Sequence, residues 1–128
     1  MSQNARSLPP TATRFVKGSR IEPQTIEALE GVKLAGYLGV KPMMVGQDMV
    51  FLEVHRQAGV TDPVHVHPDH ESICYLVKGR VRVVIDKEEF IAEAGDIWIH
   101  PPGVPHYHET LEDSIQLEIK SPPRKTWA

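Results

Sequence analysis

The chain has 128 residues, of which 41% are hydrophobic and 24% are charged, the balance of one ordinary globular domain. A formal net charge of −3 gives no electrostatic case for a nucleic-acid or anionic-membrane partner. The single cysteine, Cys74, cannot form an internal disulfide, and no apolar stretch has the length of a signal-peptide core or a membrane span, so we expect a cytoplasmic protein.

The first thirty residues are expected to form an N-terminal arm. Residues 13–17 have the composition of a short strand. A short helical turn is expected over residues 22–30, with Pro23 at its start and Gly31 after its end. Residues 31–120 are predicted to form the main domain and residues 121–128 a C-terminal tail.

From residue 31 onward the pattern is that of short strands separated by turns. Apolar residues alternate with others, as with Val50, Leu52 and Val54, and glycines and prolines stand between the alternating runs. Roughly eight strands without helices between them predict an all-β antiparallel sandwich or barrel. The strands are expected near residues 32–38, 49–56, 72–77, 81–86, 90–92, 97–99, 107–109 and 114–120.

Three histidines have the spacing of a metal site. His65 and His67 are separated by one residue, so they point to the same face of an extended strand. His106 follows a rigid proline- and glycine-rich segment over residues 101–105. Neutral imidazoles bind zinc, iron, nickel, copper and manganese, and three of them leave positions on the metal open to water or substrate. This pattern indicates a divalent metal in the interior of a small barrel.

These residues and their spacing resemble the two motifs of the cupin superfamily. Gly59, His65, His67, Glu71 and Gly79 are similar to the first motif; Gly95, Pro101, Gly103 and His106 are similar to the second, with Thr110 where an asparagine is usual. The resemblance implies a double-stranded β-helix, that is, a jelly-roll barrel. It also implies a divalent metal (Fe, Zn, Ni or Mn) held by His65, His67, His106 and a glutamate.

The position of that glutamate is open. Counted forward from His67 it is Glu71, but counted back from Gly79 the position belongs to Ser72. Neighbouring residues of a strand face opposite sides, so a regular ladder would turn Ser72 inward and Glu71 outward, whereas a bulge after His67 would turn Glu71 inward. The fourth protein ligand therefore lies between Glu71, His70 and none.

The resemblance implies a metal-dependent enzyme acting on a small oxygenated acid or dione, such as a dioxygenase, isomerase or lyase. Glu71, His70 and His108 are the candidate catalytic residues beside the metal. His100 and His55 are expected to be structural or exposed, and Trp98 to lie in the core or a dimer interface. The alternative is a cupin that binds a metal or small ligand without turnover. A homodimer is expected, because pairing covers exposed strand edges in small barrels.

Overall fold

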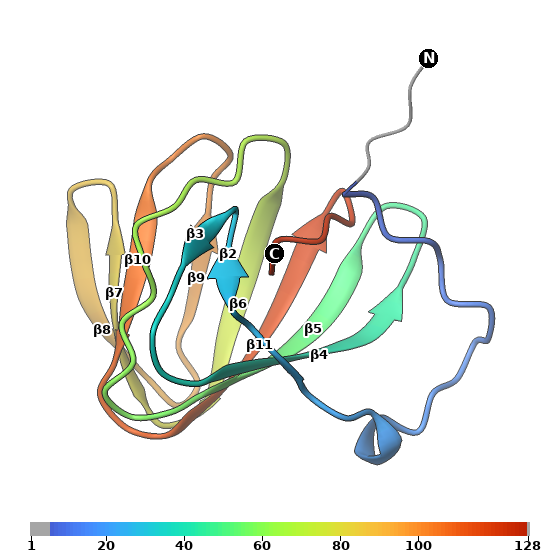
Figure 1. Cartoon of the computed structure of the whole chain (residues 1–128), viewed down its shortest axis with the longest axis horizontal. Helices are drawn as coiled ribbons and strands as arrows, with labels where there is room; N and C mark the ends of the chain where they lie inside the picture. Colours follow the sequence, from blue (N-terminus) through green and yellow to red (C-terminus); the bar gives the residue numbers. More distant parts are fainter. Residues whose placement is uncertain (1–5, 128) are drawn as a thin grey trace.

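The computed structural model describes residues 6–127, and it confirms the all-β fold, with two sheets facing each other (Figure 1). The described residues contain one short 3-10 turn, η1 (Gly18–Arg20), and no helix among them is long and apolar enough to cross a membrane.

The larger sheet has six antiparallel strands in the order β1-β4-β5-β11-β6-β9, and the smaller sheet has three in the order β10-β7-β8. The strands of the larger sheet are β1 (Gln24–Thr25), β4 (Leu38–Val45), β5 (Val50–Arg56), β11 (Ser114–Ser121), β6 (Glu71–Lys78) and β9 (Ile97–His100). Those of the smaller sheet are β10 (His106–Thr110), β7 (Arg80–Ile85) and β8 (Glu88–Glu93). A separate hairpin joins β2 (Ala28–Leu29) to β3 (Val32–Lys33).

The apolar core follows the predicted alternation on β5, where Val50, Leu52 and Val54 are buried. One core cluster packs β4 and β5 against the β2–β3 hairpin and the C-terminal tail. The other packs β6 and β9 against the smaller sheet. The members of the first are Ile26, Leu29, Leu38, Val40, Val50, Leu52, Val60 and Trp127; those of the second are Cys74, Leu76, Val81, Val83, Ala92 and Trp98.

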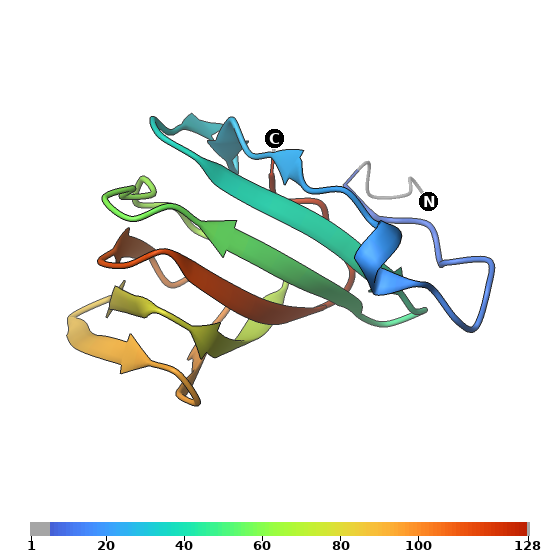
Figure 2. The same cartoon turned by 90° about the horizontal axis from the view of Figure 1, so that it is seen from below.

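The N-terminal segment differs from the sequence prediction. The expected helical turn over residues 22–30 is wrong: the segment is extended, with β1 paired to β4 and β2 paired to β3. Extension lets Ile26 and Leu29 both enter the core, which offsets the loss of helical hydrogen bonds. The expected strand over residues 13–17 is also wrong, and Phe15 there is 76% exposed. Figure 2 shows this N-terminal segment beside β4, where Thr11 bonds with Val45.

The β2–β3 hairpin and the end of the chain lie together across the front of the molecule (Figure 1). The backbone N–H of Glu30, in the hairpin turn, donates to the carbonyl of Thr126 at 2.9 Å, and Trp127 next to it is buried. Residues outside 31–120 therefore contribute to the core, and the proposed boundaries at 30 and 120 stay predictions.

Candidate metal centre

The segment before β6 brings two histidines beside β10. It is extended and exchanges backbone hydrogen bonds with β10, including both bonds between His65 and His106, at 3.1 and 3.0 Å. His65 and His67 are both buried while Val66 between them is exposed, as the alternation predicts. The ring centroids of His65 and His67 each lie within 5 Å of the His106 ring, at 4.2 and 4.6 Å. One nitrogen of each of the three rings lies within 4.8 Å of the others, close enough for a shared metal ion.

Hydrogen bonds fix which nitrogen of each ring is free. The Nδ1 atom of His65 lies 2.8 Å from the Pro63 carbonyl, and that of His106 lies 3.3 Å from the Val104 carbonyl. A carbonyl only accepts, so both Nδ1 atoms carry the proton and both Nε2 atoms have a free lone pair. The Nε2 atom of His106 is buried without a hydrogen-bond partner among the described residues. A buried, unpartnered lone pair of this kind fits a metal ligand.

The electrostatics of the barrel keep these rings neutral. Burial, followed by the nearby His65, lowers the pKa of His106 to about 3. Burial also lowers the pKa of His65, and burial together with Lys120 lowers that of His67 far below the usual range. Neutral imidazole is the form that binds metals, so the three rings are ready for ligation near neutral pH.

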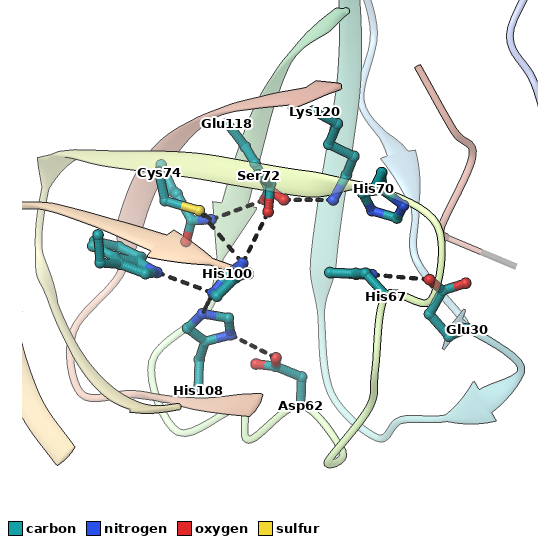
Figure 3. A network of polar contacts seen from close by, with 12 residues as sticks. Glu30, Asp62, His67, His70, Ser72, Cys74, His100, His108, Glu118 and Lys120 are labelled. Carbon is teal, nitrogen blue, oxygen red and sulfur yellow. Dashed lines mark hydrogen bonds and ion pairs between the residues drawn. The ribbon is translucent and has the colours of Figure 1, made fainter. Parts of the chain in front are cut away.

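Figure 3 shows a second polar network inside the barrel, which includes Asp62, Ser72, His100 and His108. His108 donates from Nδ1 to Asp62 at 2.8 Å, and its Nε2 lies 3.0 Å from Nε2 of His100. The Nδ1 of His100 lies 3.0 Å from the hydroxyl of Ser72. The His100 ring stacks on that of His106, with centroids 3.9 Å apart and an interplanar angle of 8°. The network therefore contacts the candidate metal centre through the stack of the His100 and His106 rings.

The carboxylate of Asp62 accepts hydrogen bonds from an arginine and from a histidine. Arg56 donates from Nη1 to its Oδ1 at 2.9 Å, and His108 donates to its Oδ2. Burial alone would raise the pKa of Asp62, but His108 and Arg56 outweigh it and hold the pKa well below the usual range. Asp62 is therefore an ionised carboxylate within this interior network.

The last strand, β11, adds an ion pair to the interior of the barrel. Glu118 and Lys120 on β11 are both buried and are bonded to each other. Burial alone would raise the pKa of Glu118, but Lys120 beside it outweighs this effect and lowers the pKa to about 2. A carboxylate oxygen of Glu118 lies within 4.8 Å of ring nitrogens of His67 and His100. An ionised carboxylate thus lies next to His67 of the triad and next to His100.

The expected role of Glu71 does not agree with its position. The ladder of β6 is regular from Glu71 to Leu76, so Ser72, Cys74 and Leu76 are buried and Glu71 is exposed. No bulge between His67 and β6 turns Glu71 inward, and it belongs to none of the groups of described residues that could hold a metal. The interior position of the motif is that of Ser72, which bonds to His100 instead. Glu71 therefore lies on the exterior of β6, away from the three histidines, and not on the inner face where it was expected.

His70 and His108 are both buried, but neither joins the group formed by the other three histidines. The Nδ1 of His70 lies 3.0 Å from Asp69 and its ring lies 4.4 Å from that of His67; burial, followed by Lys120, lowers its pKa to about 4. Its ring nitrogen forms a separate group with His67 and Glu30. His108 lies in the interior network described above.

Sequence reasoning missed several residues of this site. His100, expected to be structural or exposed, is 1% exposed and touches the metal centre, whereas His55 is half-buried and bonds to Glu53. Glu118 and Lys120 were missed because apolar residues of a strand are expected to face the interior, whereas those of β11 face outward and its polar residues face inward. A polar residue at every second position over 116–120 was the signal that could have found them.

Comparison with known proteins agrees with this architecture. Residues 52–119, more than half of the chain, match the family model described as a cupin domain. The pectin degradation protein KdgF of Dickeya dadantii (strain 3937) is 29% identical over 89 residues, which cover 67% of this chain and 81% of that protein.

Two solved structures superimpose over most of the chain. An RmlC-like cupin from Shewanella frigidimarina NCIMB 400 matches with a TM-score of 0.77 and 24% identity, covering 89% of this chain and 95% of that one. KdgF from a Halomonas species matches with a TM-score of 0.74 and 25% identity, covering 90% and 97%. The match to the family model over more than half of the residues, on a jelly-roll fold shared with these structures, shows that the chain belongs to the cupin family.

Proposed function

We propose that this protein is a metal-dependent enzyme that acts on a small oxygenated acid, with the metal held by His65, His67 and His106. The observation that carries the proposal is the convergence of three neutral rings whose Nδ1 atoms are all occupied by oxygen acceptors. Three protein nitrogens leave further positions on a metal for water and substrate, which is the arrangement of a catalytic site. Iron, zinc, nickel and manganese all accept this donor set.

A bound metal would supply Lewis acidity, polarising a carbonyl or hydroxyl oxygen or lowering the pKa of a bound water. The proton transfers would then fall to groups of the chain. Glu118 is a buried carboxylate beside His67, so it is our candidate general base, replacing Glu71 in that role. The Lys120 ammonium next to it would attract the carboxylate of an acidic substrate.

Similarity to the pectin degradation protein favours one substrate class. Pectin is built of acidic sugars, so its breakdown products carry the carboxylate and the hydroxyl or carbonyl groups that this cavity would bind. Other residues that line the cavity are apolar, among them Leu38, Val40, Leu52 and Trp127. An acidic sugar fragment would match both kinds of lining chemically, its carboxylate with Lys120 and its ring with the apolar residues.

The cavity is small in this conformation. Its volume is about 30 Å³, which is room for water molecules but not for a sugar. Leu29 of the β2–β3 hairpin and Trp127 of the tail both line it. We infer that these two segments move outward to admit a substrate.

The proposal is tested by a turnover screen over small hydroxy acids, diones and unsaturated or keto uronates, on the metal-loaded protein. Glu118→Gln removes the base and keeps the shape, so we expect kcat to fall by about 10²- to 10⁴-fold with metal binding retained. Glu71→Gln is the matched control on the exterior of β6, and it should leave kcat unchanged.

A non-catalytic binding cupin is the alternative. In that case a ligand of the panel binds to the metal-loaded protein without conversion, and Glu118→Gln changes affinity alone. Either result would overturn the enzymatic proposal.

We further propose a homodimer formed through the outer face of the larger sheet. On three adjacent strands, β11, β6 and β9, most of the outward residues are apolar, and several of them pair across the strands, such as Ile119 with Ile73 and Ile73 with Ile99. They include Ile73, Tyr75, Val77, Ile97, Ile99 and Ile119, each between 41% and 66% exposed. A continuous exposed apolar face of this kind marks an interface, and a second copy offers the same face by twofold symmetry.

Ile97→Glu is expected to convert the dimer to a monomer, because a charge buried in a self-complementary apolar face has no partner. Sedimentation equilibrium would show twice the chain mass of 14.4 kDa for the wild type and 14.4 kDa for the variant. The control Ile91→Glu, on β8 of the other sheet, should stay dimeric. A monomeric wild type would contradict the proposal.

A cytoplasmic location stays a prediction from the sequence.

A further inference from the structure

We propose that Glu30 is a positioning residue of the metal centre, whose carboxylate holds His67 in the tautomer that can bind a metal. The inference rests on the proposed function, because it takes His67 as a ligand. It concerns a residue outside both sequence motifs, contributed by the N-terminal hairpin.

The contact is a buried hydrogen bond. The Nδ1 atom of His67 lies 2.9 Å from Oε2 of Glu30, and the two side chains are 3% and 11% exposed. A carboxylate bearing a negative charge accepts, so Nδ1 carries the proton and Nε2 is left with its lone pair. A carboxylate on the far nitrogen of a ligating histidine fixes the ring and strengthens its basicity.

His67 differs in this respect from the other two histidines. His65 and His106 each donate Nδ1–H to a backbone carbonyl two residues earlier, an acceptor that no side-chain substitution removes. His67 relies on a side chain 37 residues away in the sequence. Of the three rings, His67 is therefore the one whose tautomer depends on a side chain from a separate element of the fold. Figure 3 shows its bond to Glu30.

The backbone at Glu30 is unusual for a glutamate. Glu30 and Gly31 form the two-residue turn of the β2–β3 hairpin, and their φ angles are +49° and +80°. Turns with two positive φ values favour Asn, Asp or Gly at the first position, and a longer side chain there is disfavoured. Asparagine or aspartate would suit the turn better but is one methylene shorter. Glutamate is therefore long enough to reach His67, but it suits the backbone conformation of the turn less well than asparagine or aspartate would.

The second carboxylate oxygen has its own partner. Arg6 forms an ion pair with Oε1, which leaves Oε2 for His67. The Glu30 backbone N–H donates to the carbonyl of Thr126, so the turn is also anchored to the tail. With its backbone and both oxygens held, the carboxylate has one orientation toward His67.

The test uses Glu30→Asn and Glu30→Gln, with Val32→Ala on the same hairpin as control. Asparagine favours the turn conformation, so the hairpin should form, but its side chain is too short to reach the ring. Glutamine keeps the length and a carbonyl acceptor. Val32 is exposed and lies in neither the cavity nor the triad.

Two measurements are made on each protein. Long-range proton–nitrogen NMR spectra of the metal-free protein report which nitrogen of His67 carries the proton. Competition with a chelator reports the affinity for zinc. We expect Nδ1–H in the wild type, in Glu30→Gln and in Val32→Ala, and loss of this single tautomer in Glu30→Asn. The zinc affinity of Glu30→Asn should fall by about 10- to 100-fold.

A Glu30→Asn protein that keeps the Nδ1–H tautomer, or binds zinc like the wild type, would overturn the inference. So would a fall in zinc affinity equally large in Val32→Ala, which would indicate general loosening of the hairpin. If the wild type binds no zinc, the metal proposal fails instead. The tautomer measurement needs no metal, so it still decides the role of Glu30.

Discussion

Replacing His106 with alanine is expected to lower the affinity for a divalent metal on the order of 10³-fold, because it removes one of only three protein nitrogens. His106 is 1% exposed, and its Nε2 has no other partner in the described chain. The fold should persist in the metal-free variant, because the hydrogen bonds that join residue 106 to β7 and to His65 are backbone bonds. Chelator competition with zinc or cobalt measures the loss.

Two variants serve as controls for this measurement. His55→Ala removes a half-buried histidine that bonds to Glu53, away from the triad, and should leave the affinity unchanged. Glu71→Ala removes the residue that the motif spacing suggested as a ligand, and it too should have no effect because Glu71 faces outward. A loss of affinity in Glu71→Ala, or none in His106→Ala, would show that the ligand set is wrong.

Replacing Asp62 with alanine should destabilise the protein by about 3–5 kcal/mol, the loss typical when one partner of a buried ion pair is removed. Asp62 is 1% exposed and neutralises Arg56, whose side chain is 4% exposed. Without it the guanidinium is buried without a carboxylate, and His108 loses the acceptor for its Nδ1–H. Urea denaturation of the metal-free protein at neutral pH measures the change in the free energy of unfolding.

Glu89→Ala is the matched control for Asp62→Ala. Glu89 also pairs with an arginine, Arg82, but its side chain is 54% exposed, and because water screens an exposed pair of this kind, its removal should leave the free energy of unfolding almost unchanged. A loss below about 1 kcal/mol for Asp62→Ala would mean that water replaces the carboxylate, so that the interior network is not closed to solvent.

Much of the triad could be predicted from the sequence because it depends on short-range geometry. The two-residue period of a strand places His65 and His67 on one face, and the structure has both buried with Val66 exposed. His106 was identified through its distance from the glycines and prolines that shape the preceding turn, where Gly103 has a φ of +76°. These features are local, so spacing alone is informative.

The choice between Glu71 and Ser72 could not be made from spacing. The two counts differ by one residue, and in a strand one residue exchanges the interior for the exterior. The decisive fact is the pairing of Ser72 with His100 on β9 and with Lys120 on β11. This pairing depends on neighbouring strands that are far apart in the sequence.

Glu118, Lys120 and Glu30 were hidden for different physical reasons. On β11 the apolar residues cover the outer face and the polar residues line the cavity, the reverse of an ordinary half-exposed strand. Glu30 lies in a segment that the sequence assigned to a helical turn, because Pro23 and Gly31 resemble helix boundaries. Its distance from His67 depends on how the hairpin docks on the barrel, which no local pattern encodes.

The most direct test of the central claim is a crystal structure of the protein grown with zinc or cobalt, analysed by anomalous scattering. Our account predicts one strong anomalous peak about 2.0–2.2 Å from Nε2 of His65, His67 and His106. A peak at Glu30 and His70 instead, a peak between His100 and Glu118 that leaves His65 without contact, or a fully loaded crystal with the metal only on the surface would contradict it.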